Sequence, residues 1–135
     1  MGHGRRRPAA QTSRLGNRAR VLLAVIRIAN GSLGLFAPAV TSRPLADDPE
    51  ARAPAHYPFR LFGVRTILIG AELLSKDPDV RERAVRLALP IHGSDTASAA
   101  RGGLLGELPG RSAWRLVALS GTNTVLAALA RRTLR

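Results

Sequence analysis

Six polar side chains interrupt apolar stretches of this sequence, and their types are the ones that could do chemistry there. They are Arg27, Arg65, Glu72, His92, Asp95 and Asn123. Ionisable groups inside long apolar segments are costly, so in membrane proteins they pair with one another or mark the path of an ion or ligand. This candidate polar cluster has two interpretations. It can line a small site for an anion, a proton or a lipid headgroup, or it can fasten helices together.

The rise of a helix predicts which of these charges lie at the same depth. If successive helices cross a bilayer in alternating directions, a rise of about 1.5 Å per residue places Arg65 and Asp95 together near the middle of the membrane. Arg27 and Glu72 then lie closer to the inner face. We predict the ion pairs Arg65–Asp95 and Arg27–Glu72. Because these charges cancel in pairs, we favour the fastening role over ligand binding.

The two remaining members of the cluster are uncharged partners for those pairs. His92 comes three residues before Asp95 on the same helical face, so we expect a hydrogen bond between them. One histidine beside one carboxylate offers too few ligands for a metal ion, and we expect neither a metal nor a cofactor. Asn123 lies in the last apolar stretch, from which it can hydrogen-bond toward Arg65 and Asp95.

Four long helices are expected to position these residues. Asp77-Pro78 is typical of an N-cap followed by proline at the first helical position, Pro58 could start the second helix in the same way, and Ser112 is a candidate N-cap for the last. No period-two alternation indicates a strand. We predict an all-α fold, a four-helix antiparallel transmembrane bundle, with helices at about 20–40, 57–75, 78–106 and 112–132.

The spacing of the basic residues predicts the orientation of this bundle. From the N-terminus, the segments that flank the apolar stretches hold six, two, three, one and three Lys or Arg. Such an alternation is typical of a multi-pass protein with both termini in the cytoplasm. We therefore expect a basic, disordered tail at 1–19, a single four-helix membrane domain at 20–135, and a location in the plasma membrane.

Small residues predict how the helices pack. Asn30, Gly31 and Gly34 share a helical face with Arg27. A second face, opposite Arg65 and Glu72, holds Gly63, Thr66 and Gly70. Faces of this kind let helix backbones approach closely in a membrane. The second and third helices carry several charges and would insert poorly alone, so the first and last helices must shield them.

Composition limits the alternatives. The chain has 135 residues, no cysteine and a net charge of +12. A disulfide framework and a thiolate metal site are thereby excluded. A soluble, arginine-rich protein that binds nucleic acid is the rival class, and it predicts basic residues gathered on one helix face with aromatic residues between them. Here the cations lie mostly at segment ends, so we expect no nucleic-acid partner.

The segment 60–65, Arg-Leu-Phe-Gly-Val-Arg, resembles a motif of small four-helix integral membrane proteins of unknown function from actinobacteria. It follows a glycine-rich first helix that ends in Ala37-Pro38 and precedes a third helix with a central acid, Asp95. The resemblance spans about residues 20 to 130. Members often carry an acid directly after the second arginine, where this chain has Thr66. The resemblance implies a topology but no mechanism.

Three classes of function remain. The leading one is a structural or accessory membrane protein that contacts the lipid bilayer and assembles with itself or with a larger membrane complex. A small carrier, or a membrane module that binds an anion, a proton or a lipid headgroup, is the alternative. An enzyme is not expected, because the chain has no phosphate-binding loop, Gly-x-Ser-x-Gly or His-Glu-x-x-His motif.

Overall fold

The computed structural model describes residues 7–134, and this part of the chain is all-helical, as predicted. The four long helices are α1 (Arg7–Phe36), α4 (His56–Leu73), α5 (Pro78–Leu104) and α6 (Gly110–Ala130). Short helical turns connect α1 to α4: α2 (Pro38–Thr41), η1 (Arg43–Leu45), α3 (Pro49–Arg52) and η2 (Ala53–Ala55). A last turn, η3 (Arg131–Leu134), follows α6.

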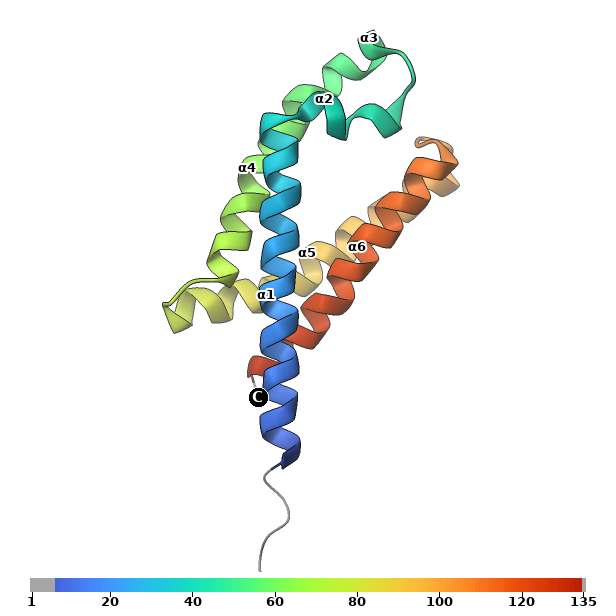
Figure 1. Cartoon of the computed structure of the whole chain (residues 1–135). Helices are drawn as coiled ribbons and strands as arrows, with labels where there is room; N and C mark the ends of the chain where they lie inside the picture. Colours follow the sequence, from blue (N-terminus) through green and yellow to red (C-terminus); the bar gives the residue numbers. More distant parts are fainter. Residues whose placement is uncertain (1–6, 135) are drawn as a thin grey trace, which may run out of the picture.

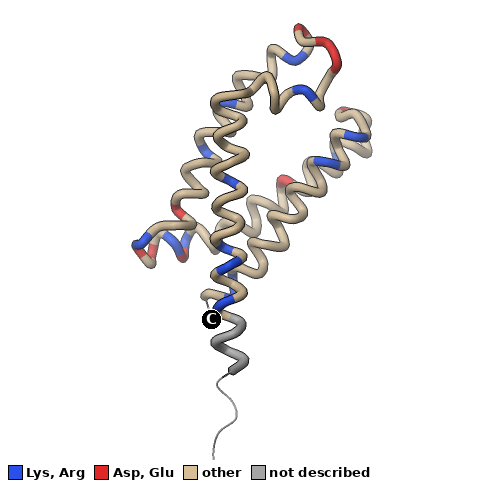
Figure 2. Tube along the Cα trace, viewed as in Figure 1, with Lys and Arg blue, Asp and Glu red and all other residues tan. Residues whose placement is uncertain are grey.

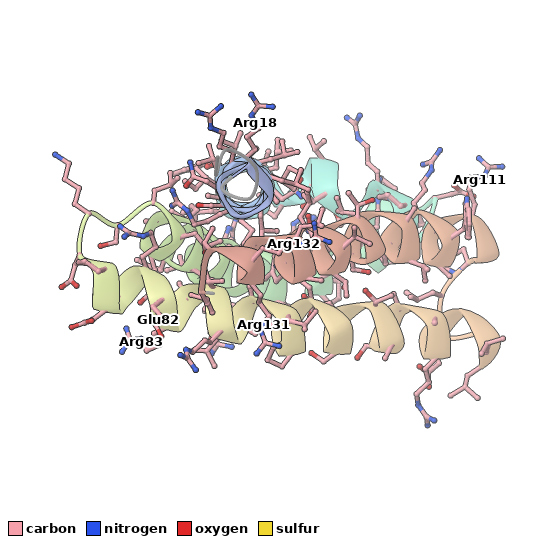
Figure 3. All side chains as sticks on the ribbon, turned by 90° about the horizontal axis from the view of Figure 1, so that it is seen from below. Arg18, Glu82, Arg83, Arg111, Arg131 and Arg132 are labelled. Carbon is pink, nitrogen blue, oxygen red and sulfur yellow. The ribbon has the colours of Figure 1, made fainter. Side chains whose placement is uncertain are left out.

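The long helices form two hairpins. Figure 1 shows α4 running back along α1, and α6 running back along α5. The hairpins cross near the end that holds the C-terminus and diverge toward the opposite end. Seen from below in Figure 3, α6 lies between α1 and α5. The predicted single bundle is therefore corrected to two hairpins whose long helices pack together at one end, while the segment that connects α1 and α4 touches the second hairpin at the other.

The hydrophobic core lies where the hairpins cross. Its fully buried residues come from all four long helices: Leu23, Ala24, Leu73, Ala84, Val85, Ala88, Ala127 and Ala130. Most of them are alanines, whose small side chains let the helices approach closely. Arg20 adds a polar link at this end, because its guanidinium donates a hydrogen bond to the backbone carbonyl of Leu73 at the end of α4.

Glycines hold α1 and α4 together, as the small faces of the sequence predict. A Cβ atom on Gly63 would lie 2.5 Å from the carbonyl oxygen of Gly31. A Cβ on Gly34 would lie 2.9 Å from the carbonyl oxygen of Phe59, and one on Gly70 would lie 3.1 Å from that of Ala24. Only glycine permits this separation of the two backbones at the first two of these positions.

The helix boundaries match the sequence prediction only in part. The carboxylate of Asp77 caps α5 as predicted, accepting from the amide of Asp79 at 2.9 Å. The start of α4 lies at His56, before Pro58. Ser112 is not the N-cap of α6, because the helix begins at Gly110 and the Ser112 hydroxyl donates to the carbonyl of Pro44. That hydrogen bond ties the connecting segment to the second hairpin.

The prediction of a disordered tail at 1–19 is wrong from residue 7 onward. The helix α1 starts at Arg7, and residues 1–6 lie outside the described part of the chain. Arg, Ala, Gln and Leu, all good helix formers, dominate this segment. Gly16 also packs against the last turn of α6, since a Cβ there would lie 3.1 Å from the carbonyl oxygen of Leu129.

Within the described residues, one helix is long and apolar enough to cross a membrane. It covers Ser13–Phe36 of α1, with a mean hydropathy of 1.5 in its best window. The other long helices do not reach the same length and hydropathy. The described structure therefore supports one candidate span, where the sequence predicted four.

Candidate functional site

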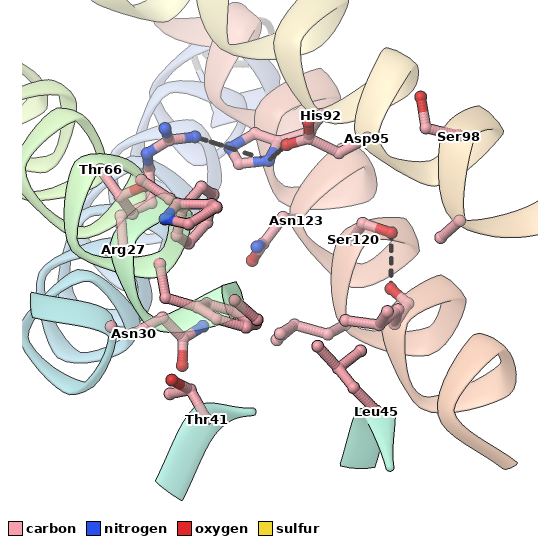
Figure 4. Close-up of a pocket in the computed structure, with 18 of the residues that line it drawn as sticks. Arg27, Asn30, Thr41, Leu45, Thr66, His92, Asp95, Ser98, Ser120 and Asn123 are labelled. Atoms are coloured by element: carbon pink, nitrogen blue, oxygen red, sulfur yellow. Dashed lines mark hydrogen bonds and ion pairs between the residues drawn. The ribbon is translucent and has the colours of Figure 1, made fainter. Parts of the chain in front are cut away.

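A cavity of about 690 Å³ lies in the space where the two hairpins diverge. Its base is polar and is formed by Arg27, Thr66, His92 and Asn123, as the close-up in Figure 4 shows. Leucine and phenylalanine side chains make up most of its walls: Leu45, Phe59, Phe62, Leu108, Leu116 and Leu119. Concave sites with apolar walls and a few convergent polar groups are typical of ligand-binding pockets.

Three side chains, Arg27, His92 and Asp95, lie in a row across the base of this cavity. Nη1 of Arg27 on α1 donates a hydrogen bond to Nε2 of His92 on α5. On the other side of the imidazole, Nδ1 of His92 lies 3.7 Å from Oδ2 of Asp95. Figure 4 marks both contacts. The first hairpin is thereby connected to the second through a charged group at each end and an imidazole between them.

The contacts of Arg27, His92 and Asp95 define the net charge of these three side chains. Arginine can only donate hydrogen bonds, so the Nε2 atom that receives one must be unprotonated. His92 is therefore neutral, and its other ring nitrogen, Nδ1, lies 3.5 Å from the same Nη1 of Arg27 and 3.7 Å from Oδ2 of Asp95. The positive charge of Arg27 and the negative charge of Asp95 cancel, and the base of the cavity carries no net charge.

Two buried polar atoms at this base have no hydrogen-bond partner within the described residues. They are Nε of Arg27 and Oδ1 of Asn123. Both residues line the cavity and are nearly inaccessible to solvent, at 4% and 7% exposed. Buried polar groups are almost always satisfied in native proteins, so each such atom requires an explanation.

The structure brings four of the six predicted cluster residues together: Arg27, His92, Asp95 and Asn123. His92 and Asp95 are neighbours, as predicted, but at 3.7 Å between Nδ1 and Oδ2 they do not form the predicted hydrogen bond. The cavity also contains Thr66, which the sequence placed only on a small packing face. Asn30, which the sequence predicts on a packing face of α1, likewise lines it.

Arg65 and Glu72 lie outside the cavity, and neither predicted ion pair forms in the described part of the chain. Arg65 is exposed on α4 and has no ion-pair partner among residues 13–134. Glu72 pairs with Arg83 at 3.3 Å. The physical reason is rotation about the helix axis: Gly63, Thr66 and Gly70 turn their face of α4 toward α1, which directs Arg65 outward.

Side-chain hydrogen bonds fix the wall formed by α5 and α6. The hydroxyls of Thr96 and Thr124 lie 3.0 Å apart and join the two helices. The Ser120 hydroxyl donates to the carbonyl of Leu116 at 2.6 Å, within α6. Among the residues that the structure describes, no group of three or more His, Asp or Glu is placed to hold a metal ion.

Comparisons of the chain with protein-family models, with curated proteins and with solved structures find no match. The resemblance to small actinobacterial membrane proteins therefore stays a prediction.

Proposed function

We propose that this chain is a small multi-pass integral membrane protein that binds a ligand from the bilayer in the cavity between its two hairpins. The observation that carries the proposal is the cavity itself, with apolar walls and a neutral, hydrogen-bonding base. The proposal assigns no reaction to the protein. It is the binding-module alternative of the sequence analysis, placed ahead of the purely accessory role because of the cavity.

Exposed apolar side chains support contact with lipid. Leu22, Val25 and Leu33 on α1 are exposed, as are Leu68 on α4 and Val125 on α6. Soluble monomers rarely expose contiguous apolar patches of large size. The close approach of α1 and α4 through glycines is also the packing mode of membrane helices, because lipid leaves no hydrophobic drive for helices to associate.

Aromatic and basic residues support a definite orientation. Tyr57 and Trp114 are 68% and 71% exposed, and both lie near the ends of α4 and α6 that are remote from the C-terminus. Tyrosine and tryptophan favour the membrane interface. Figure 2 shows Lys and Arg in blue at both ends of the molecule, and Figure 3 labels three of them, Arg18, Arg131 and Arg132, at the end that holds the C-terminus. We place that end in the cytoplasm.

A second candidate, self-association, is favoured by Arg65. This arginine is exposed in the middle of α4, between the exposed Leu61 and Leu68 on the same face. A guanidinium on the lipid-facing side of a span is costly, so such residues pair with another group or reach toward the interface. An acidic partner on another chain, either a second copy or a member of a larger complex, would satisfy it.

Membrane fractionation tests the first half of the proposal. After alkaline carbonate washing, the full-length protein should stay in the membrane pellet. Release into the supernatant would contradict the membrane placement and would favour the rival class of a soluble basic protein.

A matched pair of variants tests the binding role. Ser98 and Ser94 are both exposed on α5, one turn apart, but only Ser98 lines the cavity. A tryptophan at position 98 should occupy part of the cavity. The lipids that co-purify with Ser98→Trp should therefore lack one species that is present with the wild type and with Ser94→Trp. Equal extracts from the wild type and both variants would contradict a binding role.

A further inference from the structure

A second, smaller cavity lies at the end of the molecule that holds the C-terminus. Its volume is about 290 Å³, and residues of α1, of the start of α5 and of the last turn η3 line it. Two of these residues are the arginines Arg20 on α1 and Arg81 on α5. Ser13, Asn17 and Thr133 add uncharged polar side chains. This cavity shares no lining residue with the one between the hairpins, and its lining is mostly polar.

Uncharged acceptors hold both guanidiniums in place. Arg20 donates hydrogen bonds to the backbone carbonyl of Leu73 and, at 2.7 Å, to Oδ1 of Asn17. Nη1 of Arg81 donates to the backbone carbonyl of Ser75 at 2.9 Å. These contacts fix the two side chains without cancelling their charges. A ligand that binds to them therefore has less side-chain entropy to overcome than it would at free surface arginines.

The positive charges of Arg20 and Arg81 are not balanced within the described structure. Neither arginine forms an ion pair among residues 13–134. Glu82 also lines the cavity, but its carboxylate pairs with Arg86 at 2.5 Å. Arg20 and Arg81 are close enough for their like charges to repel each other. An anion that binds between them would offset this repulsion.

A ligand can reach these two side chains. Arg20 and Arg81 are half-buried, and Ser13 and Asn17 beside them are exposed. Arg81 uses only Nη1 in its hydrogen bonds, so its Nε–H and Nη2–H groups have no partner among residues 13–134. That edge of a guanidinium can bind two oxygens of one anion side by side. The cavity therefore offers positive charge and several donors to a group that has negative charge and several acceptor oxygens.

We infer that this cavity binds a phosphate group between Arg20 and Arg81. Phosphate has the charge and the acceptor oxygens that guanidinium groups recognise. Ser13 and Arg20 lie in the first two turns of the candidate span of α1, which in the proposed orientation is its cytoplasmic end. Basic pockets between helices on that side of a membrane bind anionic headgroups. An anionic phospholipid is therefore the expected source, although phosphate from solution has the same chemistry.

This site goes beyond the proposed function, and only the assignment of its source to lipid rests on the membrane placement. Calorimetric titration of the full-length protein in uncharged detergent micelles tests it. The probes are dioleoylphosphatidic acid, dioleoylphosphatidylcholine and inorganic phosphate. We expect phosphatidic acid to bind about tenfold more tightly than phosphatidylcholine, because the choline cation cancels the charge of its phosphate and is repelled by the arginines.

Inorganic phosphate distinguishes the two sources. If it binds more weakly than phosphatidic acid, the site belongs to a lipid headgroup. If it binds equally or more tightly, the site takes phosphate from solution. The inference is overturned if neither phosphatidic acid nor inorganic phosphate binds, or if phosphatidylcholine binds as tightly as phosphatidic acid.

Three variants that each lower the net charge by one locate the site. Asn17→Asp keeps an acceptor for Arg20 and adds a carboxylate that balances its charge. Arg81→Gln removes the second guanidinium. Each should weaken binding of the tighter phosphate probe about tenfold. Arg18→Gln is the control, because Arg18 is exposed at the same end of the molecule (Figure 3) and does not line the cavity.

Circular dichroism shows whether each variant is folded. Aspartate and asparagine have nearly the same shape, so Asn17→Asp keeps the test decisive even if Arg81→Gln does not fold. An equal loss of binding in Arg18→Gln and Asn17→Asp would show that binding follows the overall charge of the protein. Unchanged binding in Asn17→Asp would place the anion elsewhere. Either result overturns the inference.

Discussion

The buried guanidinium of Arg27 on α1 donates a hydrogen bond to Nε2 of His92 on α5, and this contact joins the first hairpin to the second at the base of the cavity. The two residues are 65 positions apart in the sequence. Because the contact lies directly beside the core at the crossing of the hairpins, it limits how far the hairpins separate and so maintains the cavity.

Replacing His92 with leucine should destabilise the protein. The change leaves the Arg27 charge buried without an acceptor, at a cost of about 1.5 to 3 kcal/mol in the free energy of unfolding. Denaturant titration in detergent micelles, followed by circular dichroism, measures it. The double variant with Arg27→Leu removes the stranded charge as well and should recover part of the loss. If the double variant loses more free energy of unfolding than the two single variants lose together, this account is contradicted.

Arg65→Leu should behave differently from changes at Arg27. Arg65 is exposed and has no ion-pair partner in the described part of the chain, so its removal should alter the free energy of unfolding by less than about 0.5 kcal/mol. The same denaturant titration applies. If the self-association candidate is right, chemical crosslinking in native membranes should decrease in this variant although the monomer is equally stable.

The sequence predicts the elements of this fold better than their arrangement. Periodicity and capping residues locate the four long helices, and Asp77 caps α5 as expected. The small residues predict the face by which α4 packs on α1. The helix α1 begins at Arg7, earlier than the basic composition of this segment predicts, because arginine and alanine are good helix formers.

The pairing of charges could not be predicted from depth alone. The rise per residue predicts the height of Arg65 along α4, but the direction of its side chain depends on which face of α4 packs against α1. That face is set by the glycines, and it turns Arg65 away from α5. Depth also predicts Glu72 as the partner of Arg27, but the crossing of the hairpins brings Arg27 to His92 instead, and Glu72 pairs with Arg83.

The packing of α1 on α4 should depend on Gly63 and not on Gly93. In Gly63→Ala, the new Cβ would lie 2.5 Å from the carbonyl oxygen of Gly31 and 2.6 Å from the amide nitrogen of Leu35. Overpacking of this kind costs about 1 to 3 kcal/mol. Gly93 is also within a helix, but a Cβ there meets no atom within 4 Å. Gly93→Ala should therefore stabilise the protein by up to about 1 kcal/mol.

Thermal unfolding in detergent compares these two variants directly. The melting temperature should fall for Gly63→Ala and rise or stay constant for Gly93→Ala. Similar changes in both variants would show that helix propensity, and not the approach of the two backbones, decides the effect.

Reporter fusions test the orientation of the helices in the membrane. Asp48 lies in the connection between α1 and α4, and Pro109 lies in the turn between α5 and α6, so both should report an external position. Lys76, in the turn between α4 and α5, and Arg132, in η3, should report the cytoplasm, because basic residues are retained on that side.

Only α1 meets the length and hydropathy of a span on its own, so α4 must cross by packing its glycine face on α1. An external reporter at Asp48 combined with an external reporter at Lys76 would show that α4 does not cross, and the protein would then be anchored by α1 alone.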